Sequence, residues 1–352
     1  MKLRILTLAM LAVSASAFAT DYLETEGNDS KVGANVFTNL VSGDRIIGTS
    51  TGSSTTAPGV GSADYFKINT AALAQGIYRH RLTITTNGTA GHTGTLRGLT
   101  TSGAVTNVSA ATIGAGTDVA VQTSSTTSTI ARSNEWYGFG AAEEMYYRVT
   151  GGTATTAQYE ATLTTEVITP VDLGTYQPGV INFSTYDLAK SPSGTTFSYT
   201  DTEITLYDSN FNSQINWNND DYFPLTSPHN FSSRLSLNLA AGVYYFAVSQ
   251  FNLANNLAPG FINENSGNDN VMDFGGSLVE SSASITQGSP AVPISLDFSV
   301  QDSVMGAPNV FDAAKPGSYG VYWGKMTVVP EPGTMAALGL GAVALIRRRR
   351  SK

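Results

Sequence analysis

The chain has 352 residues, of which 41% are hydrophobic and only 13% are charged, so it is long enough for two domains with apolar cores but weakly charged outside. Residues 20–332 hold 12 basic and all 27 acidic residues, a formal charge of −15 that excludes nucleic-acid binding and favours divalent cations. The absence of cysteine excludes disulfides, thiol catalysis and Cys-ligated zinc.

Residues 1–19 are predicted to form a secretory signal peptide. Lys2 and Arg4 precede an apolar run from Ile5 to Val13, and small residues at alternate positions then offer cleavage sites that end at Ala17 and Ala19. We expect cleavage after Ala19 and therefore export. The alternative, a buried helix of a cytosolic domain, fits less well because no polar face interrupts the apolar run.

The body, from about residue 20 to 328, is predicted to be all-β. Short alternating segments such as Tyr78–Ile84 and Leu235–Leu239 are separated by Gly, Asn, Asp, Ser and Pro, and no long stretch has the helical period of 3.6. This pattern is typical of antiparallel β-sandwiches.

A short internal repeat indicates two related halves. Leu73–Tyr78 and Leu239–Tyr244 both have the form Leu-Ala-x-Gly-[Ile/Val]-Tyr, which fits a strand end, a tight turn that needs glycine, and a second strand with an aromatic residue. Pro170 follows the last strand of the first half. We therefore expect domains at residues 20–169 and 170–328.

Both halves resemble the bacterial pre-peptidase C-terminal (PPC) domain, which is found beside secreted peptidases and in other exported proteins. The resemblance implies two jelly-roll-like antiparallel β-sandwiches. The segments that carry it are Glu24–Ser30, Ser62–Ile68 and Leu73–Tyr78 in the first half, and Asp201–Asp208, Asn218–Asp221 and Leu239–Tyr245 in the second.

The acidic segment after residue 23 is a candidate calcium site. Glu24, Glu26 and Asn28 alternate and would share one face of an extended chain, with Asp29 adjacent, and calcium prefers such oxygen ligands. The resemblance to calcium-dependent PPC domains adds Asp64, where those domains have further acids. The alternative is a solvated acidic turn at a domain edge.

The second half offers a weaker calcium candidate at Asn219, Asp220 and Asp221. A run of Asn and Asp is first of all a turn signal, and that interpretation leads here.

The sequence predicts no enzyme. Gly48–Gly52 has the form Gly-x-Ser-x-Gly, but that motif requires a strand before it and a helix after it, and a low-complexity loop follows instead. The three histidines, His80, His92 and His229, share no metal-binding spacing, and His80 lies in a predicted strand where a buried structural role is expected.

The C-terminal residues 329–352 are predicted to be a sorting tail. Pro330, Glu331 and Pro332 precede a 14-residue apolar stretch that ends at Ile346, and Arg347–Arg350 follow. This order resembles the PEP-CTERM sorting signal of exosortase systems, which implies a hydrophobic helix transiently in the inner membrane and an exosortase-like processing enzyme as partner. Such a helix is about 21 Å long against a hydrocarbon core of about 30 Å, so the anchor is marginal. A permanent single-pass tail is the alternative.

These signals predict an exported, non-catalytic protein of the cell envelope, cell surface or extracellular matrix. One alternative is a carbohydrate-binding or adhesive module for exopolysaccharide, in which aromatic residues near turns, such as Trp136, Trp217 and Trp323, would stack on sugar rings. A secreted hydrolase of unrecognised type is the second alternative. Calcium is the one cofactor that the sequence favours.

Overall fold

The computed structural model describes residues 19–50, 63–88, 91–99, 120–126, 131–151, 155–193, 196–211, 213–218, 232–250, 254–255, 278–280, 294–315 and 320–329. Every regular element among them is a β-strand, so the all-β prediction is confirmed for this part of the chain. The described part contains no helix with the length and apolar character that a membrane span needs. The expected signal helix and C-terminal helix lie outside the described residues.

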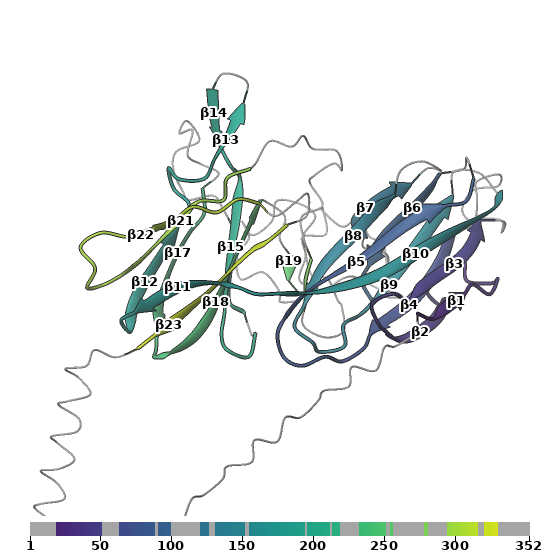
Figure 1. Cartoon of the computed structure of the whole chain (residues 1–352), viewed down its shortest axis with the longest axis horizontal. Helices are drawn as coiled ribbons and strands as arrows, with labels where there is room; N and C mark the ends of the chain where they lie inside the picture. The colour runs from purple at the N-terminus through teal and green to yellow at the C-terminus, as the bar shows by residue number, and fades with distance from the viewer. Residues whose placement is uncertain are drawn as a thin grey trace, which may run out of the picture.

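The first half of the chain builds two sheets that pack face to face (Figure 1). Their inner faces form one apolar core that includes Phe66, Leu82, Trp136 and Tyr159. The first sheet contains, in spatial order, β1 (Asp21–Leu23), β3 (Arg45–Ser50), β10 (Thr155–Ile168), β5 (Ile77–Thr86) and β8 (Arg132–Gly138), followed by β20 (Leu278–Glu280) and β19 (Ala254–Asn255). The second contains β2 (Asn35–Leu40), β4 (Ala63–Thr70), β9 (Glu144–Gly151), β6 (His92–Arg97) and β7 (Ala120–Thr126).

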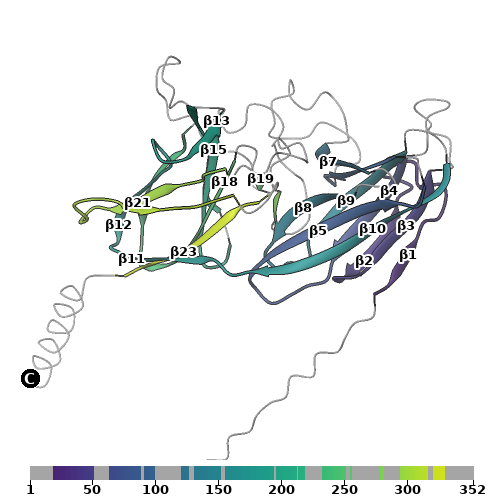
Figure 2. The same ribbon diagram turned by 45° about the horizontal axis from the view of Figure 1, so that its top comes forward.

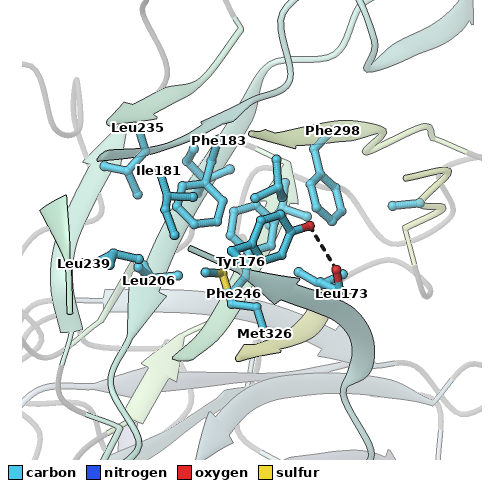
Figure 3. Close-up of a cluster of buried hydrophobic side chains, with 14 of the residues drawn as sticks. Leu173, Tyr176, Ile181, Phe183, Leu206, Leu235, Leu239, Phe246, Phe298 and Met326 are labelled. Carbon is cyan, nitrogen blue, oxygen red and sulfur yellow. Dashed lines mark hydrogen bonds between the residues drawn. The ribbon is translucent and has the colours of Figure 1, made fainter. Parts of the chain in front are cut away.

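The second half has the same two-layer arrangement around its own core. Phe183 stacks on Phe246, whose ring makes a tilted contact with Phe298, and the Tyr176 hydroxyl donates to the Leu173 carbonyl oxygen at 2.9 Å (Figure 3). One sheet contains β11 (Val171–Tyr176), β23 (Tyr322–Val328), β18 (Gly242–Gln250), β15 (Thr202–Tyr207) and β16 (Ser213–Asn218). The other contains β17 (Arg234–Leu239), β12 (Gly179–Ser184), β21 (Phe298–Asp302) and β22 (Asn309–Phe311), and β13 (Lys190–Ser193) pairs with β14 (Thr196–Tyr199) apart from both.

The sequence pattern predicted purely antiparallel sheets, and three parallel strand pairs show that this prediction is wrong. β1 pairs with β3, β2 with β4, and β11 with β23 in parallel register. In the first half the chain alternates between the two sheets through its first four strands. Between β1 and β3, and between β2 and β4, the chain passes once through the other sheet. The two strands of each pair therefore run in the same direction and pair in parallel.

The repeated turn has the same structure in both halves. The Tyr78 hydroxyl donates to the Ala74 carbonyl oxygen at 2.9 Å, and the Tyr244 hydroxyl donates to the Ala240 carbonyl oxygen at 3.1 Å. The two strands that follow the turn, β5 and β18, each pair with the last strand of their half, β10 and β23. The repeat therefore marks an equivalent corner, although the strand orders of the two halves differ.

The two halves lie side by side (Figure 2). Buried side chains from both halves pack into one cluster, which we call the seam. The Tyr137 hydroxyl accepts a hydrogen bond from the Val321 backbone N–H at 3.1 Å, and β20 from the second half pairs with β8 of the first. The predicted boundary near Pro170 falls between β10 and β11, which belong to different sheets. The seam consists of Ile77, Tyr137, Phe139, Tyr207, Phe211, Ala247, Val321 and Trp323.

Candidate functional site

The segment after β1 folds back so that two predicted calcium ligands meet. Gly27 has a φ of +101°, a conformation that glycine adopts without strain, and the chain turns there. The Asn28 side-chain amide consequently donates to Glu24 Oε1 at 3.3 Å, while the Thr49 backbone N–H donates to Glu24 Oε2 at 2.7 Å. The Asn28 carbonyl oxygen accepts from the Tyr65 N–H at 2.9 Å, which fixes the segment against β4.

Asp64 of β4 lies beside this segment and is fully buried. The Tyr159 hydroxyl, from β10, donates to Asp64 Oδ2 at 2.8 Å. Gly48 of β3 leaves the space that this cluster occupies, because a Cβ there would collide with both the Glu24 carboxylate and the Tyr159 hydroxyl. Three strands and the N-terminal segment thus converge on Glu24, Asn28 and Asp64.

Burial dominates the electrostatics of this cluster. Burial raises the pKa of Glu24, and hydrogen bonds with the Thr49 N–H, Asp64 and Asn28 offset part of that rise. Burial also raises the pKa of Tyr159 well above its ordinary value, and the charges of Asp64 and Glu24 add to the effect. Two carboxyl groups in hydrogen-bonding reach of each other need a shared proton or a cation between them.

Amide and carboxylate oxygens, the kinds that this segment offers, are ligands that a hard cation such as calcium accepts. The side-chain oxygen Oδ1 is buried in both Asn28 and Asp29, and neither atom receives a hydrogen bond from a described residue. Calcium takes amide and carboxylate oxygens together and completes its shell with water. In the described part of the chain no three His, Asp or Glu side chains gather as a metal site, so a cation here would also need amide or water oxygens. Calcium therefore stays a prediction.

The structure places the predicted ligands unequally. Glu24, Asn28 and Asp64 come together, whereas Glu26 is exposed and Asn28 is buried, so the alternating residues do not share one face. The turn at Gly27 is the physical reason. The other predicted site residues lie outside the described residues; they are Asn219, Asp220, Asp221, Pro330, Glu331 and Pro332.

Sequence reasoning did not find Tyr159. Its partner Asp64 is 95 residues away, and no local pattern connects them. Gly48 carried a signal, because a glycine inside a strand pattern indicates close approach by another group.

Ser50, from the Gly-x-Ser-x-Gly pattern, pairs with a histidine that the sequence did not connect to it. Ser50 Oγ lies 3.2 Å from His92 Nε2, and His92 Nδ1 lies 2.9 Å from Thr86 Oγ1. All three side chains are buried, and burial lowers the pKa of His92. A catalytic histidine is oriented by a third polar group, commonly a carboxylate, whereas His92 Nδ1 pairs here with the Thr86 hydroxyl. We interpret the trio as a polar link between the two sheets of the first half.

The aromatic residues considered for sugar stacking are buried where the structure describes them. Trp136 lies in the core of the first half, and Tyr137 and Trp323 lie in the seam. The Trp217 side chain lies outside the described residues.

The end of the body lies directly before the predicted sorting tail. The Val329 N–H donates to the Tyr176 carbonyl oxygen at 2.9 Å, immediately after β23. Comparison with protein families matches residues 328–350 to the PEP-CTERM protein-sorting motif. This family match does not extend to the segments that resemble PPC domains, and no curated protein matched the chain. The chain therefore carries a C-terminal PEP-CTERM sorting motif, which implies exosortase-dependent sorting of a secreted protein.

Proposed function

We propose that this protein is an exported, non-catalytic component of the cell envelope or extracellular matrix, released from its C-terminal tail by an exosortase-like enzyme. The observation that carries the proposal is the sorting motif at residues 328–350, which begins where the last strand of a β-sandwich body ends. β23 lies between β11 and β18 in its sheet, so the tail leaves from a firmly paired strand.

The position of the motif supports processing after folding. The Val329 N–H makes a backbone hydrogen bond to the body, and Pro330 follows at once. Proline has no N–H to continue strand pairing, and it disfavours helix in the residue before it. The sequence of Pro330, Glu331 and Pro332 therefore predicts an extended, accessible segment before the apolar stretch, which suits cleavage by a membrane protease.

The test is to replace Pro330, Glu331 and Pro332 together with alanine in the native cells and to measure the intact mass of the recovered protein. We expect the wild type to lose residues from its C-terminus and the variant to retain Lys352 and accumulate in the membrane fraction. Pro178→Ala, in the loop between β11 and β12, is the matched control and should be processed normally. Identical C-termini in wild type and variant would contradict the proposal.

A further inference from the structure

One turn of the first half supplies the central aromatic ring of the seam. The Phe139 ring stacks on Phe211 with centroids 4.5 Å apart and planes 9° apart, and it also contacts Tyr207 at 5.3 Å and Trp323 at 5.9 Å. Phe139 follows β8 directly and begins the turn to β9. The position of this ring therefore depends on the shape of the turn at residues 139–143.

Glu143 determines the shape of that turn. Its Oε1 accepts hydrogen bonds from three consecutive backbone N–H groups, those of Phe139 at 3.1 Å, Gly140 at 3.2 Å and Ala141 at 3.3 Å. Its Oε2 accepts from the Thr70 hydroxyl at 2.6 Å. The side chain is only 1% exposed, and hydrogen bonds to a carboxylate are about twice as strong as neutral ones. The charged carboxylate thus holds the turn in place.

His80 of β5 lies beside this carboxylate and is equally buried. Its Nε2 is 3.6 Å from Glu143 Oε2, and no described residue forms a hydrogen bond with Nε2. Its Nδ1 lies 2.9 Å from Thr165 Oγ1 of β10, and the ring stacks on Trp136 of β8 with centroids 5.2 Å apart. When both ring nitrogens carry a proton, the positive imidazolium would therefore lie directly against the group that shapes the turn.

Other charged groups near β5 lie away from the imidazole. Arg79 and Arg81 alternate with His80 along the strand and point to the opposite face, where they pair with Glu166 and Glu135. On the imidazole's own face, Tyr78 has its ring centroid 6.3 Å away. Half-buried Lys315, from the second half, faces Glu135, and burial lowers its pKa to about 7.

We propose that His80 acts as a proton-sensitive latch, so that its protonation loosens the 139–143 turn and weakens the docking of the two halves. An imidazolium would draw Glu143 Oε2 away from the Thr70 hydroxyl and pull the carboxylate out of the three backbone N–H groups. Phe139 would then lose its place against Phe211. This inference goes beyond sorting and does not depend on it.

The direction of the pH effect on the seam follows from the linkage between proton binding and stability. Burial lowers the pKa of His80, and the opposing effect of the Glu143 charge is smaller. The folded state therefore prefers the neutral imidazole more than the unfolded state does. The resulting stabilisation is fully present above the ordinary histidine pKa of about 6.5 and is lost as the pH falls through the lower folded pKa. Acid should open the seam.

The test is hydrogen–deuterium exchange of the mature chain at pH 7.5 and pH 5, corrected for the intrinsic pH effect. We expect the protection factors of peptides that contain residues 139–143 and Phe211 to be at least tenfold lower at pH 5 than at pH 7.5. His80→Gln keeps a neutral polar side chain of similar size that cannot gain a proton in this pH range, so it should reduce that loss to less than threefold. His92→Gln is the matched control, because His92 is also buried with a lowered pKa but bonds to Ser50 and Thr86.

A second variant keeps the proposal testable if His80→Gln folds poorly. Glu143→Gln removes the charge that the imidazole faces, so it should open the seam at both pH values and leave little pH dependence there. Residual pH dependence from Lys315 is common to all variants and does not affect the comparison. Seam protection that is unchanged by pH in the wild type, or an equal pH effect in the wild type and His80→Gln, would overturn the latch.

Discussion

At the scale of single residues, the candidate site shows which contacts a sequence can predict. Glu24 and Asn28 were recognisable because acidic and amide residues close together in sequence fit a hard cation. Their actual approach depends on Gly27, which turns the chain, and not on strand alternation. The contact of Asp64 with Tyr159 joins strands of opposite sheets, and only tertiary packing creates it.

The calcium hypothesis leads to a prediction at this scale. Added calcium should raise the Tm of EDTA-treated protein, because a ligand at about 100 times its Kd stabilises the folded state by about 2.7 kcal/mol. Asp64→Asn should abolish the increase, since it removes a buried carboxylate of the cluster. Glu26→Gln, at an exposed position, should retain most of it. Differential scanning fluorimetry with and without calcium measures the effect, and an unchanged Tm in the wild type would rule out useful binding.

At the scale of elements, local patterns predicted strands and turns better than strand pairing. The Leu-Ala-x-Gly-x-Tyr repeat was recognised from six residues, and both copies form the same corner. The parallel pairs were missed because alternation shows that a segment is a strand but not which neighbour it joins. Pairing depends on the path of the chain between the two sheets.

Because the two corners are equivalent, the hydrogen bonds of Tyr78 and Tyr244 should contribute equally to the free energy of unfolding. Tyr78→Phe and Tyr244→Phe should each lower the free energy of unfolding by about 1 kcal/mol, because each removes one hydroxyl-to-carbonyl hydrogen bond and little else. Urea denaturation followed by circular dichroism gives both values. Tyr245→Phe is the control, since the phenylalanine ring can keep the stacking on Phe211, and it should change stability less. A large effect in one half and none in the other would argue against equivalent corners.

At the scale of the whole molecule, the seam is the feature that the sequence did not predict. Every side chain from Asn134 to Tyr137 in β8 is buried, including Glu135, so this strand is covered on both faces. Trp136 faces the core of its own sandwich, while Tyr137 faces the second half. The sequence alone does not separate these two roles, because nothing local distinguishes a core residue from a residue at an interface between halves.

The seam predicts that the two halves unfold together. Trp323 packs on Tyr137 and Tyr207, both at 5.6 Å, so Trp323→Ala should remove about 3–5 kcal/mol of packing from the contact between halves. The wild type should then show one calorimetric transition at neutral pH, and the variant two, since each half keeps its own core. Trp323→Phe, which preserves an aromatic ring, should keep a single transition at a lower Tm. Two transitions already present in the wild type would mean that β20 pairing and the aromatic seam are too weak to couple the halves, and the proton latch at His80 would then have little to control.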